Sequence, residues 1–197
     1  VFISKTPLIH NYDLSSLKVI FCGAAPLKQE TEEQVKDLFK RRIFVLQAYG
    51  MTETTAGIIA SFAGNEAPGS IGDVEEGIYA KVIDENGKSL GPHKVGEVCC
   101  KGNRIMKGYL NDKEATTEML DKNGWLKTGD MGYYDEKNRF YIVDRLKELI
   151  KYKAFQVPPA ELEGLLLAHP KIKDAGVIGI ADDIAGELPF AFVVKQP

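Results

Sequence analysis

Two short apolar runs near the start of the chain flank a segment with helical spacing. Residues 17–22 and 43–46 combine apolar and β-branched side chains, which is typical of buried strands. Between them, apolar residues recur at the spacing of one helix face, namely Val35, Leu38 and Phe39. The order strand, helix, strand predicts a right-handed crossover and a parallel pair. The segments 23–26 and 49–54 should then leave the carboxyl ends of these strands, where open α/β sheets bind ligands.

From about residue 70 the spacing of apolar residues changes from that of a helix to that of short strands. Four stretches are typical of strands: residues 79–84, 96–101, 131–135 and 139–144. The dipeptide Asn86-Gly87 is a strong hairpin signal, and residues 113–120 can form one short helix. Short strands with frequent turns predict a small antiparallel sheet or barrel.

A third unit is expected after Lys147. Residues 148–157 are strand-like, and Pro158-Pro159 opens a helix that Pro170 closes. Two further strands are expected at residues 175–180 and 190–195. The fold class is therefore α/β: the end of a large α/β domain with parallel strands, a small antiparallel β subdomain, a hinge, and the start of a small α+β domain.

Composition excludes several classes of function. The 197 residues carry a formal net charge of −3, which gives no general attraction to nucleic acid. Apolar runs stay well short of the roughly 20 residues of a transmembrane helix, so no transmembrane segment is expected. The cysteines are interpreted as buried thiols in a reducing compartment: Cys22, Cys99 and Cys100. The three histidines form no metal-ligand spacing, so no cluster made only of protein ligands is expected.

The segment 49–54 combines groups that suit a nucleotide. Tyr49 can stack on a base, and Gly50 allows close approach of the backbone to a ligand. Thr52 can donate to a phosphate oxygen, and Glu53 is a hard oxygen ligand for Mg²⁺. Taken alone, the segment is about equally well explained as a turn with a hydroxyl cap.

Two charged positions further along the chain also suit a nucleotide. Asp130 follows Thr128 and Gly129, and an ionised carboxylate can accept from both hydroxyls of a ribose. Arg145 offers a planar fork suited to a ribose hydroxyl or a phosphate oxygen. Each of these residues, like Lys147 and Lys151, would ordinarily be assigned to a solvated turn or strand face.

In this order and spacing the segments resemble successive signatures of the adenylate-forming (AMP-binding) superfamily. The match is closest to its 4-coumarate–CoA ligase-like and luciferase-like acyl-CoA synthetases and extends over nearly the whole chain. It is carried by residues 23–26, 47–54, 125–132, 143–152 and 155–157.

The resemblance implies a two-step ligase. ATP and a fatty or cinnamic-type carboxylic acid give an acyl-adenylate and pyrophosphate, and the thiol of CoA then displaces AMP. A carboxylate is a poor electrophile until its oxygen becomes part of a phosphate leaving group, and the developing charge must be met by cations and fixed donors. ATP, Mg²⁺ and CoA are the implied cofactors or co-substrates, and the acid is the implied small-molecule partner.

The same resemblance assigns roles to single residues. Tyr49 would stack on adenine, Thr52 would contact phosphate, Glu53 would help hold Mg²⁺, and Asp130 with Arg145 would grip the ribose. The nucleotide- and CoA-binding set carried over by motif is Gly23, Ala24, Ala25, Pro26, Gln47, Ala48, Tyr49, Gly50, Met51, Thr52, Asp130, Ile142, Arg145, Lys147, Lys151 and Gln156. The catalytic set is Thr52, Glu53, Arg145 and Lys151.

The resemblance also implies domain boundaries. Residues 1–145 would belong to the large AMP-binding domain, with the β subdomain at about 70–145. A hinge at 146–147, containing Lys147, would connect it to a mobile domain that begins at 148. Lys151 and Gln156 would lie on the face presented in the second half-reaction.

Departures from the family pattern limit this reading. The Ser/Thr/Gly-rich phosphate loop expected upstream and the lysine of a Pro-Lys-x-x-x-Gly-Lys-type segment expected downstream are not in this sequence. We therefore expect an internal fragment of a longer ligase that does not complete adenylation by itself. Ala154 stands where many members have glycine, and Ala56 stands where beetle luciferases typically have serine.

The leading hypothesis is a cytoplasmic or peroxisomal acyl- or aryl-CoA synthetase. One alternative is a luciferase-type monooxygenase, against which Ala56 argues. A second alternative, from another class, is a nucleotide-binding module that performs no chemistry.

Overall fold

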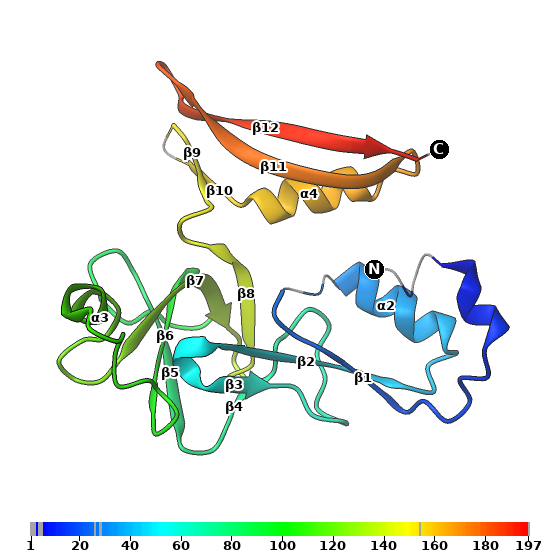
Figure 1. The fold of residues 1–197 in the computed structure, drawn as a ribbon, viewed down its shortest axis with the longest axis horizontal. Helices are drawn as coiled ribbons and strands as arrows, with labels where there is room; N and C mark the ends of the chain where they lie inside the picture. Colours follow the sequence, from blue (N-terminus) through cyan, green and yellow to red (C-terminus); the bar gives the residue numbers. More distant parts are fainter. Residues whose placement is uncertain (1–2, 4–5, 26, 28, 154, 197) are drawn as a thin grey trace.

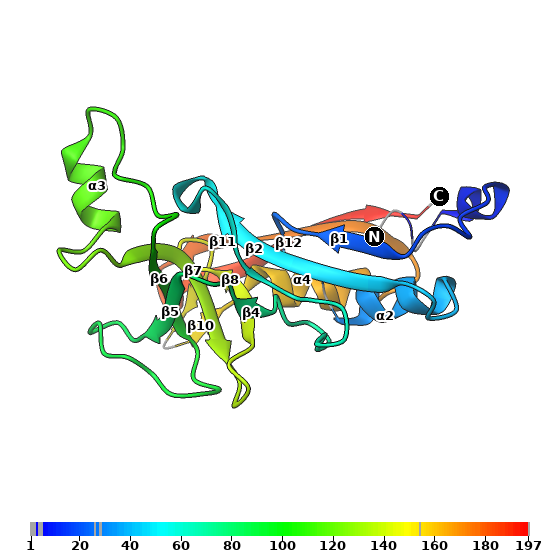
Figure 2. The same cartoon turned by 90° about the horizontal axis from the view of Figure 1, so that it is seen from below.

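The computed structural model describes residues 3, 6–25, 27, 29–153 and 155–196. The described residues form three four-stranded sheets with few helices, and Figure 1 shows the third of them, β9–β12, apart from the other two. Figure 2 shows the short helix α3 (Lys113–Met119) at one end of the molecule and the 3₁₀ turn η1 (Pro7–Asn11) at the other. The mixed α/β class with several small sheets agrees with the sequence prediction.

The first sheet has the order β1-β2-β3-β4. Its strands are β1 (Val19–Cys22), β2 (Phe44–Met51), β3 (Ala56–Ala60) and β4 (Asp73–Val74). Helix α2 (Gln29–Leu38) connects β1 to β2, and these two strands pair in parallel, which confirms the predicted strand–helix–strand unit. An apolar cluster fixes the helix to the sheet and contains Val35, Phe39, Ile43 and Val45.

Strand β2 is longer than the sequence pattern predicts. Its first half pairs in parallel with β1, and its second half pairs antiparallel with β3. Tyr49, Gly50 and Met51 therefore lie inside a strand, and only the 3₁₀ turn η2 (Thr52–Thr54) follows it. The prediction that 49–54 leaves the carboxyl end of this strand was wrong for its first half, because pairing with β3 keeps that half inside the strand.

The second sheet is an antiparallel meander in the order β5-β6-β7-β8. Its strands are β5 (Ile78–Ile83), β6 (Gly96–Gly102), β7 (Leu126–Tyr134) and β8 (Phe140–Arg145). This confirms the small antiparallel sheet and the helix predicted at 113–120. Strand β7 begins earlier than predicted because Leu126 and Lys127 pair with Cys100 and Cys99 across a bulge.

One core joins the first two sheets. Its buried members come from β3, β5, β6, β8 and the connection before β4: Ile58, Ile59, Ile71, Ile78, Val82, Val98, Cys100 and Phe140. Cys99 and Cys100 are buried free thiols, and burial raises the pKa of each to about 12. They therefore pack as small apolar side chains.

The third sheet, in the order β10-β9-β12-β11, lies in a lobe of its own. It contains β9 (Ile150–Tyr152), β10 (Phe155–Val157), β11 (Ile172–Asp182) and β12 (Gly186–Lys195), with helix α4 (Pro159–Leu167) packed on β11. The stretch 148–157 is a hairpin of two short strands and not one strand, since Lys153 has a φ of +53° and turns the chain.

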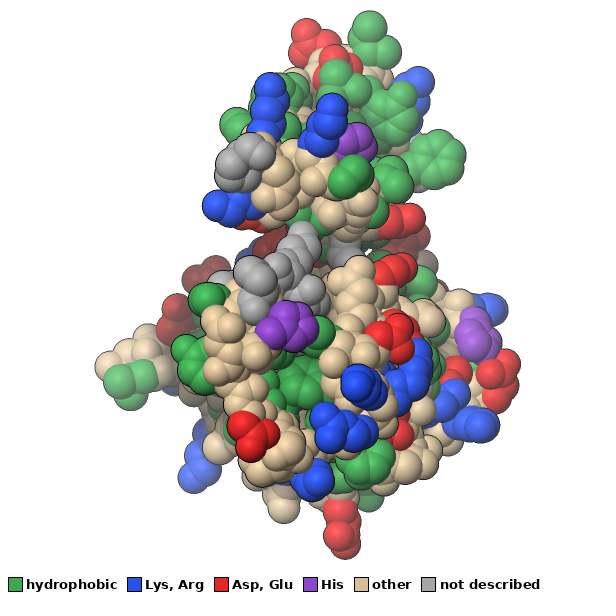
Figure 3. All heavy atoms as spheres, turned by 90° about the vertical axis from the view of Figure 1, so that its right-hand side faces the viewer, with side chains coloured by type: hydrophobic (Ala, Val, Ile, Leu, Met, Phe, Trp, Pro, Cys, Tyr) green, Lys and Arg blue, Asp and Glu red, His purple; other side chains and the backbone are tan. Residues whose placement is uncertain are grey.

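The carboxyl-terminal lobe keeps large apolar side chains on its surface. Figure 3 shows hydrophobic side chains on this lobe, and those of β11 and β12 that are exposed are Ile178, Ile180, Phe190, Phe192, Val193 and Val194. Among the helices of the described residues, none is long and apolar enough to cross a membrane.

Candidate functional site

Three strands bring together Tyr49, which is predicted to stack on adenine, and the predicted ribose-binding residues Asp130 and Arg145. The Tyr49 hydroxyl, from β2, donates to Asp130 Oδ2 at 2.6 Å. Arg145, at the end of β8, is the cross-strand partner of Asp130 on β7, and its Nε lies 3.6 Å from Asp130 Oδ1. Residues separated by 81 positions in the sequence thus meet at one carboxylate.

A bulge in β7 aims Asp130 at this position. Gly129 has a φ of +72°, a conformation that glycine adopts without strain. Its N–H donates to Glu97 Oε1 at 3.1 Å, and its carbonyl accepts from the N–H of Leu146 at 2.8 Å. The Thr128 hydroxyl donates to the Val98 carbonyl at 2.7 Å and accepts from the N–H of Asp130 at 3.1 Å. The motif glycine is therefore needed for backbone shape.

Burial affects both members of the Tyr49–Asp130 pair. The Asp130 side chain is only 15% exposed, and burial raises its pKa, opposed by the Tyr49 hydrogen bond and the charge of Arg145. Burial also raises the pKa of Tyr49, and the neighbouring carboxylate adds to the effect. Tyr49 therefore remains a hydrogen-bond donor at neutral pH.

The loop after β1 lies beside the middle of β2. A side chain at Gly23 would lie 3.2 Å from the Ala48 carbonyl oxygen, and Ala24 has a φ of +68°. Ala25 follows in the same exposed loop, whereas Pro26 lies outside the described residues. The structure thus brings the predicted Gly23–Ala25 and Ala48 segments together.

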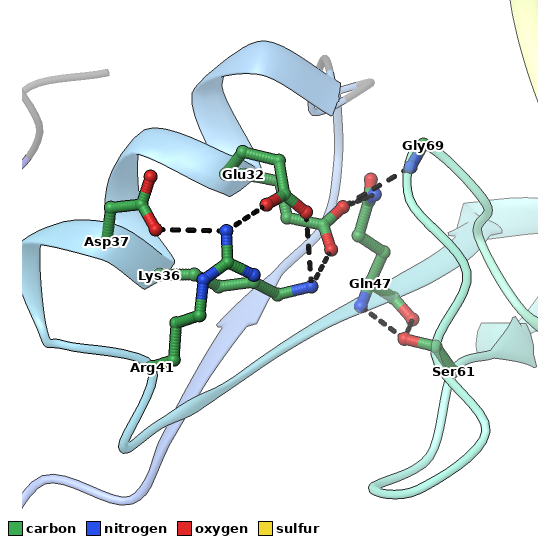
Figure 4. Close-up of polar contacts among 8 residues, drawn as sticks. Glu32, Lys36, Asp37, Arg41, Gln47, Ser61 and Gly69 are labelled. Atoms are coloured by element: carbon green, nitrogen blue, oxygen red, sulfur yellow. Dashed lines mark hydrogen bonds and ion pairs between the residues drawn. The ribbon is translucent and has the colours of Figure 1, made fainter.

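Gln47 is predicted to contact the nucleotide, but its side chain is buried and already bonded within the protein. Its Oε1 accepts from the N–H of Leu27 at 3.2 Å, and its Nε2 donates to Glu32 Oε2 at 3.4 Å. Glu32 is 2% exposed, accepts from the N–H of Gly69 at 3.3 Å, and pairs with Lys36 at 2.5 Å (Figure 4). This network connects α2, β2, the loop after β1 and the connection before β4.

Glu53 is the predicted metal ligand. It follows β2 in the turn η2, and its Oε1 accepts from the hydroxyl of Tyr109 at 2.6 Å. Among the described residues no group of three or more His, Cys, Asp or Glu side chains could hold a metal ion. A single carboxylate with Oε2 outside this bond suits Mg²⁺, which usually keeps several waters and binds through one or two carboxylates plus substrate phosphates.

Other residues of the same motif shape the backbone. Thr52 is exposed, as a phosphate donor must be. The buried Thr54 hydroxyl accepts from the N–H of Met51 at 2.9 Å and lies 2.7 Å from the Ala56 carbonyl oxygen. A side chain at Gly50 would overlap that same carbonyl, so this glycine is required by packing inside the protein.

The remaining predicted residues lie on or after β8. Ile142 is half-buried and packs on the core shared by the first two sheets. Lys147 is exposed and lines a hollow of about 430 Å³ between Asp144, α4 and β11. Lys151 and Gln156 are exposed cross-strand partners in the β9–β10 hairpin. Within the described part of the chain, no hydrogen bond or ion pair joins this hairpin to the Tyr49–Asp130 pair. The hinge at 146–147 stays a prediction.

Sequence reasoning did not identify Glu32 and Tyr109. Helical spacing could have predicted that Glu32 is buried, because Glu32 lies three residues before the buried Val35 on the same helix face. Tyr109 has no comparable signal, since it reaches Glu53 across 56 positions of sequence.

The chain matches known protein families over most of its length. A family model described as AMP-binding enzyme matches residues 3–110, and one described as AMP-binding enzyme C-terminal domain matches residues 161–197. The chain is similar to luciferin 4-monooxygenase of Nipponoluciola cruciata, with 55% identity over 98% of this chain and 35% of that protein. It is also similar to 4-coumarate–CoA ligase 1 of Glycine max, with 51% identity over 98% of this chain and 67% of that protein.

A solved structure agrees at the level of the fold. The structure of o-succinylbenzoate CoA synthetase from Bacillus subtilis in complex with its acyl-adenylate intermediate matches with a TM-score of 0.85 and 33% identity, over 96% of this chain and 39% of that one. The chain spans about a third of the length of the first of these relatives. The matched segments and the shared fold show that the chain belongs to the AMP-binding enzyme family.

Proposed function

We propose that the full-length protein carrying this sequence activates a carboxylic acid with ATP and transfers the acyl group to CoA. Family membership and the similarity to a 4-coumarate–CoA ligase support this reaction. The acid would be of the fatty or cinnamic type. A role in fatty acid metabolism and a cytoplasmic or peroxisomal location are part of the same proposal.

The reaction consists of two displacements. In the first, a carboxylate oxygen of the acid bonds to the α-phosphorus of ATP as the bond to pyrophosphate breaks. In the second, the CoA sulfur bonds to the acyl carbon as the bond to AMP breaks, and the thiol proton is lost. Mg²⁺ bound to the phosphates would neutralise charge that develops on the departing pyrophosphate.

The residues of this chain would mainly bind and orient the nucleotide. Asp130 would accept from the ribose hydroxyls, with Arg145 beside it, while Tyr49 would present its ring to the base. Thr52 would donate to a phosphate oxygen, and Glu53 would hold the cation. Lys151 would act with Gln156 from the carboxyl-terminal lobe in the second step.

The observation that carries the proposal is the set of contacts that Asp130 makes with Tyr49 and Arg145. A partly buried carboxylate stands at a strand bulge between a tyrosine hydroxyl and an arginine. Burying a charge is unfavourable, so a carboxylate kept there without a full ion pair favours a role in ligand binding.

The test follows pyrophosphate release by the full-length protein with ATP, Mg²⁺ and a panel of fatty and cinnamic acids. Thioester formation is then measured after CoA is added. Asp130→Asn should lower the rate of release by tenfold or more, because a neutral amide binds ribose hydroxyls less strongly. The matched control is Asp84→Asn in the β5 turn, where either side chain can accept from the N–H groups of Asn86 and Lys88. ATP binding without pyrophosphate release from any acid would instead favour a non-catalytic nucleotide-binding module.

A luciferase-type monooxygenase is the second candidate, and the 55% identity to luciferin 4-monooxygenase favours it. Ala56, at the position where beetle luciferases typically have serine, argues against it. Light emission from the full-length protein with luciferin, ATP and O₂, in the absence of CoA thioester formation, would decide for this candidate.

A further inference from the structure

Residues 104–109 lie alongside the turn that carries Glu53. Hydrogen bonds join the two segments at Arg104, Met106 and Tyr109. The N–H of Met106 donates to the Glu53 carbonyl at 2.8 Å, and the Thr55 hydroxyl donates to the Arg104 carbonyl at 2.9 Å. At the end of the segment, the Tyr109 hydroxyl donates to Glu53 Oε1 at 2.6 Å. Both the main chain and the side chain of Glu53 therefore accept hydrogen bonds from the segment 104–109.

The segment itself is anchored at both ends. Arg104 donates to the Gly57 carbonyl at 2.8 Å and pairs with Glu75 at 2.6 Å. The N–H of Tyr109 donates to the hydroxyl of Thr116, on α3, at 2.9 Å. The phenol of Tyr109 is thus positioned by elements outside the Glu53 turn, and its place does not depend on that turn alone.

The Tyr109 bond has a specific consequence for the carboxylate. The phenol donates its one proton to Oε1, so this oxygen is engaged and the orientation of the carboxylate is restricted. No hydrogen bond from another described residue reaches Oε2, so this oxygen can bind a ligand outside the protein.

We propose that Tyr109 is a positioning residue that aims Oε2 of Glu53 at the divalent cation of the bound nucleotide. This inference rests on the proposed function, in which Glu53 meets Mg²⁺ on the phosphates. Preorganising the carboxylate lowers the entropy lost when the cation binds. Tyr109 should therefore affect the cation-dependent part of nucleotide binding and leave the cation-independent part unchanged.

The experiment measures ATP binding to the full-length protein by calorimetry, once with EDTA and once with Mg²⁺. The variants are Tyr109→Phe, Glu53→Gln and the double variant, and the control is Tyr79→Phe at an exposed tyrosine of β5. Tyr109→Phe should weaken binding with Mg²⁺ by about three- to tenfold, the effect expected for a charge-assisted hydrogen bond near the surface. Binding with EDTA should not change, and the double variant should bind no more weakly than Glu53→Gln.

Each other outcome overturns the inference in a distinguishable way. Equal weakening with EDTA and with Mg²⁺ would assign Tyr109 a general structural role, as would additive effects in the double variant. Normal binding by Tyr109→Phe alongside weak Mg²⁺-dependent binding by Glu53→Gln would reject only the positioning role. Normal binding by Glu53→Gln would reject the cation role of Glu53 in the proposed function.

Discussion

Replacing Glu32 by alanine should loosen the unit formed by α2 and β2. The Glu32 carboxylate is buried, pairs with Lys36 at 2.5 Å, and accepts from Gln47 Nε2 and from the N–H of Gly69 (Figure 4). Gln47 in turn accepts from the N–H of Leu27, in the loop after β1. The substitution therefore removes the centre of a network that joins four segments: α2, β2, the loop after β1 and the connection before β4.

The magnitude follows from the burial of the ion pair. The side chains of Glu32 and Lys36 are 3% and 15% exposed, and removing one partner of a buried pair destabilises a protein by roughly 3–5 kcal/mol. Glu33 lies 4.0 Å from Lys36 and offers partial compensation. We therefore expect a loss near the lower limit, about 3 kcal/mol.

The assay is hydrogen exchange of the amides in α2 and β2 of the full-length protein, measured by mass spectrometry. A loss of about 3 kcal/mol corresponds to roughly hundredfold faster exchange. The control is Glu30→Ala at an exposed position of the same helix, which should change exchange severalfold at most. The double variant Glu32→Leu with Lys36→Met should recover most of the protection, because it removes both charges together.

Two results would refute this reasoning. Equal exchange in Glu32→Ala and Glu30→Ala would mean that the buried pair contributes nothing to local stability. A double variant as unstable as Glu32→Ala would mean that the lost hydrogen bonds from Gln47 and Gly69, which leucine cannot accept, and not an unpaired charge, dominate the loss.

Two further predictions concern the site. Gly50→Ala should lower the free energy of unfolding, measured by urea denaturation, by more than about 2 kcal/mol, because the new methyl group would overlap the Ala56 carbonyl. The control is Gly91→Ala, which should change the free energy of unfolding little because the space around Gly91 is open. Similar losses in both variants would contradict this prediction. Burial raises the pKa of Asp130 above its ordinary 3.8, so the folded state favours the proton and this group's contribution to stability falls as pH rises through that raised pKa. Asp130→Asn should therefore gain stability relative to the unsubstituted protein between pH 4 and pH 7, compared by urea midpoints, and a relative loss over that range would show that Arg145 outweighs burial.

The sequence pattern was sufficient for elements whose signal is local. The parallel β1–β2 pair, the antiparallel second sheet and the short helix α3 all follow from hydrophobic periodicity and turn residues. Boundaries that depend on pairing partners were less accurate. Strand β2 continues through Tyr49 because β3 pairs with it, and the strand predicted at 148–157 turns at Lys153.

The sequence by itself determined the residue types of the site and their family motifs, since these are fixed by order and spacing along the chain. Only the tertiary structure decided which of them meet. Tyr49 reaches Asp130 because strand pairing and the bulge at Gly129 place them face to face, and Tyr109 reaches Glu53 because Arg104 and α3 hold its segment against η2. Such contacts span 81 and 56 positions, and they depend on register and backbone shape, which no local pattern encodes.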